Sequence, residues 1–293
     1  MSPDAQAGEA LDPAAAAHVK QCCARLYESE IVVRLLGDSF HPGGAALTER
    51  VGQLLALTPD SRVLDAASGK GASAILLAQR FGCAVVGVDL SSQNVAHATS
   101  EADRLGLTDR VTFKVGDAEQ LPLDDASMDA LICECAFCTF PDKRAAAHEF
   151  ARVVRPGGRV GLSDITRASG PDGELADLMA WVACLADACP ADAYAARLAE
   201  AGFIDAAVEN HDSVLLEMIR HIGSRLFAVD VLRGLKKIDL EGIDFDAARR
   251  MTRQALVAVE GHRLGYAVVR ATKPEMGDTG EHRMTVEHVE WQT

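Results

Sequence analysis

The chain has 293 residues, 48% of them hydrophobic and 25% charged, with a formal net charge of −14. This composition fits one large globular domain or a domain with an appendage, and the acidic balance argues against a nucleic-acid partner, which needs clustered lysine and arginine. No apolar run approaches the roughly 18–20 residues of a membrane span, and residues 1–20 lack the pattern of a signal peptide. We therefore expect a cytoplasmic protein without a membrane partner, whose eight cysteines stay reduced.

The N-terminal region, 1–57, is expected to be a tail followed by a helical cap. Residues 1–14 are rich in Ala, Pro and Asp, which is typical of disorder. Helical spacing of apolar residues follows over 14–38, where two helices are expected, and over 46–57, where a third is expected. A glycine- and proline-rich loop at 37–44 separates the last two of these helices.

Short β-branched segments alternate with helical ones over 58–165. This order is typical of a parallel sheet covered by helices on both faces, so we predict an α/β, Rossmann-like core. Residues 166–273 are expected to add helices on the substrate side and the remaining strands, near 206–212 and 264–273, with two helices between them. Residues 274–293 mix charges with few apolar residues, which predicts a flexible tail.

The stretch "VLDAASGKGAS" ends the first predicted strand and opens a helix. Gly69 and Gly71 allow a ligand to approach the backbone closely, and the helix N-terminus offers free N–H groups. The motif differs from a dinucleotide fingerprint because Asp65 lies in the turn and Ala67 stands where the first glycine would be. A carboxylate there would repel a pyrophosphate, so it favours a cationic or amine-bearing ligand.

Two further acids follow the next two strands. Asp89, followed by Leu90, comes about 20 residues after the turn, where a carboxylate can accept both hydroxyls of a ribose. Asp117, followed by Ala118, ends the third strand, where it could meet an adenine amino group. Each acid alone could be a helix N-cap, but three acids at three successive strand ends favour a binding site.

The segments "VLDAASGKG", "VVGVDLS", "VGDAEQLPL", "MDALICEC" and "VVRPGGRVGLSD" together resemble the class I S-adenosylmethionine-dependent methyltransferases, over roughly residues 61–164. The resemblance implies a seven-stranded sheet whose last strand is antiparallel, with S-adenosyl-L-methionine across the carboxyl ends of strands one to three. It assigns the methionine portion to Asp65, Gly69 and Gly71, the ribose to Asp89, and the adenine to Asp117 and Ala118. Ala67 and Leu90 complete the expected cofactor-binding set.

Cysteines occur in the three segments that would surround the substrate in such a fold. They are Cys22 and Cys23 in the first helix, Cys133, Cys135 and Cys138 after the fourth strand, and Cys184 and Cys189 beyond the fifth. Strand alternation predicts that Cys133 and Cys135 share a side, whereas Cys138 lies in a loop. Cys83 is expected in the core or at a sheet edge.

The segments "CECAFCTFPDK" and "WVACLADACPADAYAARLAEAGF" resemble the arsenite methyltransferases. In that family three thiolates bind As(III) and leave its lone pair facing the methyl group, so no general base is needed. The resemblance implies Cys135, Cys184 and one of Cys22 or Cys23 as ligands, with Cys23 preferred as the catalytic one, Cys138 as a fourth ligand or relay, and a thiol reductant as a partner. Residues 136–139 depart from the family's Asn-rich pattern, so another metalloid, mercury, or a selenium or sulfur compound stays open.

Three other interpretations remain. The acceptor could be a small organic metabolite such as a quinone, sterol-like compound or polyketide, with His41, His148, His211 or Glu134 as the base and cysteines as apolar lining. A zinc site is less favoured, because no second Cys or His pair completes the C-x-C and C-x₂-C spacing. A non-enzymatic metalloid-binding protein is less favoured still, because the cofactor motifs are complete.

Overall fold

The computed structural model describes residues 41–168, 187–234, 245–277 and 286–290. The helices expected at 14–38 and part of the substrate-side region expected over 166–273 lie outside these ranges, and so do Cys22, Cys23 and Cys184. Within the described ranges, no helix has both the length and the hydropathy that a membrane span requires.

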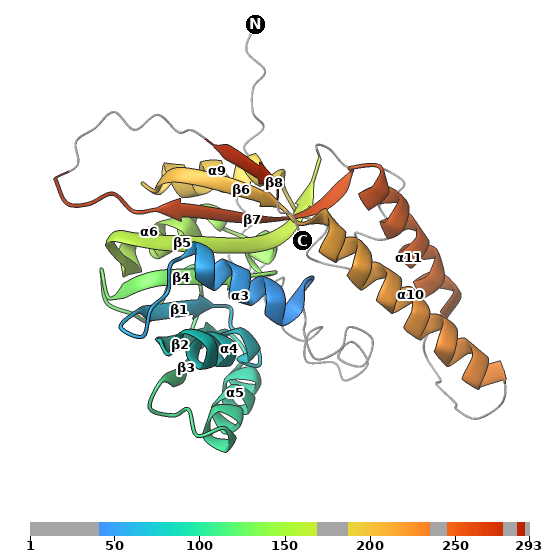
Figure 1. Ribbon diagram of the computed structural model, residues 1–293, viewed down its shortest axis with the longest axis horizontal. Coiled ribbons are helices and arrows are strands. Elements are labelled where there is room, and N and C mark those ends of the chain that lie inside the picture. The colour runs from blue at the N-terminus through green and yellow to red at the C-terminus, as the bar shows by residue number, and fades with distance from the viewer. Residues whose placement is uncertain (1–40, 169–186, 235–244, 278–285, 291–293) are drawn as a thin grey trace, which may run out of the picture.

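An eight-stranded sheet forms the centre of the molecule, in the order β3-β2-β1-β4-β5-β7-β6-β8 (Figure 1). β1 to β5 are mutually parallel, and β7 runs antiparallel to its neighbours β5 and β6. This arrangement confirms the predicted α/β, Rossmann-like sheet, in which the last predicted strand is antiparallel. The strands are β1 Arg62–Ala66, β2 Ala84–Asp89, β3 Val111–Val115, β4 Met128–Glu134, β5 Val154–Arg167, β6 Ile204–Asn210, β7 Leu264–Thr272 and β8 Glu287–Glu290.

The eighth strand corrects both the predicted strand number and part of the predicted tail. β8 pairs in parallel with β6, from Ala207 opposite Glu287 to Asn210 opposite Glu290. Without this pairing β6 would expose a row of backbone N–H and C=O groups at the sheet edge. The segment has a single apolar residue, Val289, between charged and polar ones, so its strand depends on the neighbouring edge and gives no hydrophobic signal of its own.

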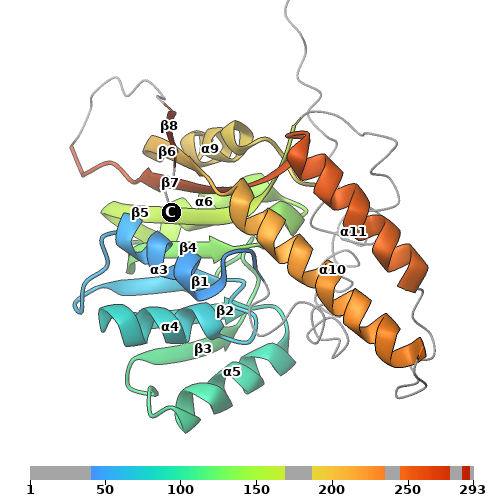
Figure 2. The same ribbon diagram turned by 45° about the vertical axis from the view of Figure 1, so that its right-hand side comes forward.

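Helices cover both faces of the sheet, with α3, α4 and α5 on one face and α6 and α9 on the other (Figures 1 and 2). Gly52 lets α3 and α4 approach closely, since a Cβ there would overlap the Phe81 ring. Helices α10 and α11 are inserted between β6 and β7. They project beyond the sheet and pack mainly against each other (Figure 2). The helices are α3 Gly44–Leu54, α4 Ala72–Phe81, α5 Ser92–Arg104, the 3₁₀ turn η1 Phe137–Thr139, α6 Lys143–Val153, α9 Ala191–Glu200, α10 Asp212–Gly234 and α11 Phe245–Glu260.

The core lies between these layers, and its strands are apolar on both sides as parallel central strands require. Leu64 in β1, Ile132 in β4 and Val160 in β5 are all 0% exposed. Such central strands are rigid, and they fix the polar residues that follow them at one edge of the sheet. That edge holds the candidate site.

Candidate active site

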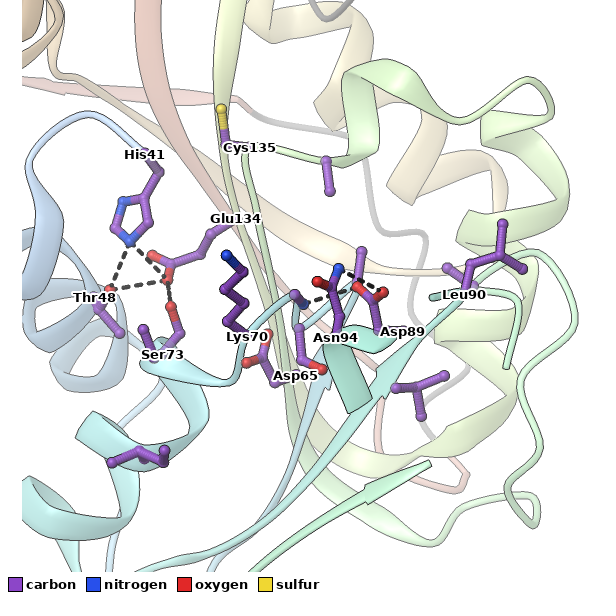
Figure 3. Close-up of a pocket in the computed structure, with 18 of the residues that line it drawn as sticks. His41, Thr48, Asp65, Lys70, Ser73, Asp89, Leu90, Asn94, Glu134 and Cys135 are labelled. Carbon is purple, nitrogen blue, oxygen red and sulfur yellow. Dashed lines mark hydrogen bonds and ion pairs between the residues drawn. The ribbon is translucent and has the colours of Figure 1, made fainter. Parts of the chain in front are cut away.

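A pocket of about 830 Å³ opens at the carboxyl ends of β1, β2 and β4. Its walls come from these strand ends, from the start of α4 and α5, and from α3 with the residues before it. All the predicted cofactor-binding residues except Gly71 line it. Figure 3 shows its two ends, with Asp89, Leu90 and Asn94 at one and His41, Thr48, Glu134 and Cys135 at the other.

The glycine-rich turn between β1 and α4 approaches the pocket with its backbone. Gly69 has a φ of 52°, a Cβ there would meet open space, and its N–H donates to Asp89 Oδ2 at 2.8 Å. Ala67 also has a left-handed φ, 59°, which costs about 1 kcal/mol for a residue with a Cβ.

Gly71 is the predicted residue that does not line the pocket. It is the N-cap of α4 with a φ of 82°, and a Cβ there would lie 2.5 Å from Phe113 Cζ and 2.8 Å from Ala98 Cβ. The glycine therefore brings α4 against α5 and β3. Its function in this structure is packing behind the turn.

Asp65 is buried at the back of the pocket, 2% exposed. Burial raises the pKa of its carboxyl well above the usual value, and the negative charges of Glu134 and Asp89 raise it further. Among the described residues, Asp65 Oδ2 and the nearby Ser68 Oγ have no hydrogen-bond partner. A buried acceptor and a hydroxyl in the wall of a cavity suit a ligand that brings a donor group, above all a cationic one.

Asp89 and Asp117 shape the other end of the pocket. Asp89 Oδ1 accepts from the Ser91 N–H at 2.9 Å and from Asn94 Nδ2 at 3.2 Å, while Ser91 itself caps α5. Asp117 Oδ1 accepts from the Glu119 N–H at 2.9 Å and closes the turn after β3. Neither acid is a helix N-cap, which removes the main structural alternative for these two residues. The adjoining Leu90 is 43% exposed, an apolar surface beside polar groups.

Glu134, the last residue of β4, is the centre of a polar cluster at the opposite end. Its side chain is 3% exposed, and Oε2 accepts from Thr48 Oγ1 at 2.9 Å and Ser73 Oγ at 2.6 Å. Ser163 Oγ in β5 donates to Oε1 at 3.3 Å, and His41 Nε2 lies 3.6 Å from Oε2 (Figure 3). The cluster thus joins α3 and α4 to the centre of the sheet.

Of the three histidines considered as bases, His41 alone lines the pocket. Its Nδ1 lies 3.1 Å from Pro42 O, and its Nε2 lies 3.3 Å from Thr48 Oγ1. His148 is on the exposed face of α6. His211 is 1% exposed beside Glu209, away from the pocket, and burial lowers its pKa.

The structure separates the cysteines after β4. Cys135 lines the pocket with a φ of 52°, and its N–H donates to Ser163 O at 2.7 Å. Since β4 ends at Glu134, alternation does not extend to Cys135, and the expectation that it shares a side with Cys133 was wrong. Cys133 is 0% exposed in the core, where burial raises its pKa well above the usual value.

Cys138, predicted as a fourth ligand or relay, lies in η1 and is 0% exposed, outside the pocket lining. Its N–H donates to the buried Asp164 Oδ2 at 2.9 Å. Cys83 is in the core as expected, and Cys189 is partly exposed near Asp187. No set of three His, Cys, Asp or Glu side chains in the described ranges is arranged to hold a metal ion.

The sequence is similar to those of known methyltransferases. Residues 63–158 match the methyltransferase domain family. The 27-O-demethylrifamycin SV methyltransferase of Amycolatopsis mediterranei is 28% identical over 84% of this chain and 94% of its own length. The arsenite methyltransferase of Halobacterium salinarum is 34% identical, but over 50% of this chain and 38% of its own length. Residues 63–158 form a methyltransferase domain, and the protein is a methyltransferase that uses S-adenosyl-L-methionine.

Several solved structures have the same fold as this protein. The [4+2]-cyclase SpnF is 24% identical with a TM-score of 0.68, covering 88% of this chain and 97% of its own. The phosphoethanolamine N-methyltransferase 2 of Haemonchus contortus, with S-adenosyl-L-methionine, is 21% identical with a TM-score of 0.74, covering 88% of this chain and 60% of its own. At this identity the likeness shows the fold alone. S-adenosyl-L-methionine is the methyl donor of the class.

Several residues of the methyltransferase pocket gave no signal in the sequence. Thr48 and Ser73 are single hydroxyl residues within helical patterns, and Asn94 lies in the first turn of α5. Lys70 stands between the two glycines of the turn but was not among the predicted site residues, and Figure 3 shows its side chain between those of Asp65 and Glu134. The fold brings Thr48 and Ser73 to Glu134, from which they lie 86 and 61 positions away in the chain.

Proposed function

We propose that this methyltransferase transfers a methyl group from S-adenosyl-L-methionine to a small thiophilic acceptor, arsenite or a chemically similar species. Of the five cysteines that the structure describes, Cys135 alone lines the pocket, at the end opposite Asp89, and this observation carries the proposal. The partial similarity to an arsenite methyltransferase supports it. A soft thiolate is the protein ligand best suited to such an acceptor.

The donor is proposed to occupy the other end. Asp89 and Leu90 would hold the ribose and Asp117 and Ala118 the adenine, while Asp65, Ala67 and Gly69 would face the methionine portion. The buried, partnerless Asp65 Oδ2 supports this assignment, because the donor carries an ammonium group. When bound, the donor supplies an electrophilic methyl group, and the protein's part is to orient the acceptor and exclude water.

An acceptor such as arsenite attacks with its own lone pair, so its binding ligands take the place of a general base. Cys135 is the ligand supported by the structure, and Cys184 with Cys23 or Cys22 are the further ligands proposed from the resemblance, outside the described ranges. Cys138 is not among the ligands we propose, because it is fully buried behind the pocket. A small thiol is the expected reductant for this set.

A second candidate acceptor is a small organic molecule that loses a proton from a hydroxyl group. The pair of His41 and Glu134 supports it, because both ring nitrogens of His41 face acceptor atoms. A neutral imidazole can donate a hydrogen bond to only one of these two oxygen atoms. A proton taken from the hydroxyl group of the organic substrate would allow the ring to donate to both. The long match to a rifamycin methyltransferase also favours this class.

One assay distinguishes the candidates. Reduced full-length protein is incubated with methyl-labelled donor and either arsenite or a panel of phenols and polyketide alcohols. We expect methylated arsenic from the wild type and from Cys189→Ser, the matched partly exposed cysteine outside the pocket, and none from Cys135→Ser. Labelled organic product together with inactivity toward arsenite would contradict the thiophilic acceptor and support the second candidate.

A further inference from the structure

The wall of the pocket carries more acidic than basic side chains. The acids are Asp65, Asp89, Glu101, Asp117 and Glu134, and the basic or titratable nitrogen groups are Lys70, His41 and His97. Asp89 and Asp117 are each engaged in local turns at the far end, and Glu101 pairs with Arg104. Asp65 and Glu134 are the buried acids of the pocket wall.

Three hydroxyl groups hold the carboxyl group of Glu134. Thr48, Ser73 and Ser163 donate to its two oxygens, which fixes the side chain at the wall of the pocket. Its field extends across the pocket, because Glu134 is the leading charge that, after burial, raises the pKa of Asp65. The two carboxylates therefore act on the same part of the cavity.

The methyl donor and the demethylated product differ in the charge of one atom, the sulfur. S-adenosylmethionine has a positive sulfonium, whereas S-adenosylhomocysteine has a neutral thioether, and the adenosine and amino-acid groups are the same. A fixed carboxylate near the sulfur stabilises the sulfonium and not the thioether. Contacts to the shared groups, including those at Asp89 and Asp117, cannot distinguish the two molecules.

We propose that Glu134 is a specificity-determining residue, whose buried and hydroxyl-held carboxylate makes the pocket bind the sulfonium donor in preference to the thioether product. The proposal rests on the donor site proposed above. Its functional consequence is weaker product inhibition, since the ligand loses its attraction to Glu134 when the methyl group leaves. Neither Thr48 nor Ser73 touches the donor in this account, so both are positioning residues for the carboxylate.

The expected size follows from Coulomb's law. The attraction between two opposite unit charges about 6 Å apart, at an effective dielectric constant of about 20, changes a binding constant by roughly a hundredfold. Lys70 and, when protonated, His41 face the same carboxylate region and offset part of this field. We therefore expect Glu134 to contribute about tenfold to the preference.

The test is isothermal titration of full-length protein with S-adenosylmethionine, S-adenosylhomocysteine and sinefungin, which has an ammonium group near the sulfonium position. Glu134→Gln should weaken binding of the donor and of sinefungin about tenfold and change binding of the thioether less than about threefold. Glu134→Asp, which keeps the charge, should keep the preference. Glu209→Gln removes a buried carboxylate of similar exposure outside the pocket and should leave the preference unchanged.

Equal weakening of all three ligands in Glu134→Gln, or no weakening of any, would overturn the proposal. Retained binding of the thioether reports an intact site, and if the glutamine variant does not fold, Glu134→Ala is titrated in the same way. A wild-type protein that binds none of the ligands would refute the donor site itself. The two failures are thus distinct.

Discussion

Replacement of Asp65 by asparagine should stabilise the protein without ligand while weakening the binding of its methyl donor. The side chain is 2% exposed, Oδ2 has no partner among the described residues, and the charges of Glu134 and Asp89 oppose its ionisation. An asparagine keeps one oxygen for the Ala74 N–H that contacts Asp65 and removes the buried charge. The gain expected from relieving one such buried group is about 1–2 kcal/mol, or roughly 2–6 °C in Tm for a chain of this size.

The pH dependence gives the sign of this effect. The pKa of Asp65 is higher in the folded protein than in the unfolded chain, so the unfolded state releases the proton first as the pH rises. The wild type therefore loses stability above the unfolded value of about 4, until the pH passes the folded pKa. Asp65→Asn lacks this loss, so the two proteins should unfold alike near pH 4 and differ most above neutrality.

Thermal unfolding between pH 4 and 8 measures the stability of the two proteins, and calorimetric titration measures donor affinity. Loss of a charge-assisted hydrogen bond to the donor should weaken binding by about 10–100-fold. A variant that is less stable than the wild type at pH 8 would refute the argument from desolvation. Unchanged donor affinity would refute the role of Asp65 in binding the methionine portion.

Two further substitutions test the frame of the donor site. Asp89→Ala should weaken donor binding at least tenfold, because one hydrogen bond to a charged group is lost. Unchanged affinity in a titration would mean that the ribose lies elsewhere. Gly71→Ala should lower the free energy of unfolding by about 1–3 kcal/mol, since its Cβ would overlap Phe113 at a positive φ. Urea denaturation measures this loss, and a stability equal to that of the wild type would show that α4 shifts freely.

The sequence was sufficient to predict that Asp65, Asp89 and Asp117 lie at one pocket, because they follow strands in a fixed order. Asp65, Asp89 and Asp117 come directly after or at the end of apolar segments, and parallel strands bring their carboxyl ends to one edge. Gly71, predicted as a ligand contact, lies outside the pocket lining for a local reason. Two glycines in one turn look alike in a sequence, whereas Gly69 faces open space and Gly71 faces the Phe113 ring.

The acceptor end could not be derived in the same way, since it joins segments that are distant in the chain. Thr48 lies 86 positions from Glu134, and Ser73 lies 61 positions from it. Alternation failed at Cys135 because the strand ends one residue earlier and the backbone turns left-handed. Cys133 lies within the strand and in the core, whereas Cys135 lies one residue beyond the strand and lines the pocket.

The left-handed turn at Cys135 also links the two proposals made for this end of the molecule. Such a backbone costs about 1 kcal/mol for a residue with a side chain, and glycine would avoid the cost. The Cys135 N–H bonded to Ser163 O and the Ser163 hydroxyl bonded to Glu134 hold the turn against β5. Ser163 therefore supports the turn at Cys135 through its backbone oxygen and the carboxylate through its hydroxyl, so Ser163→Ala should lower the donor preference while the turn at Cys135 keeps its backbone hydrogen bond.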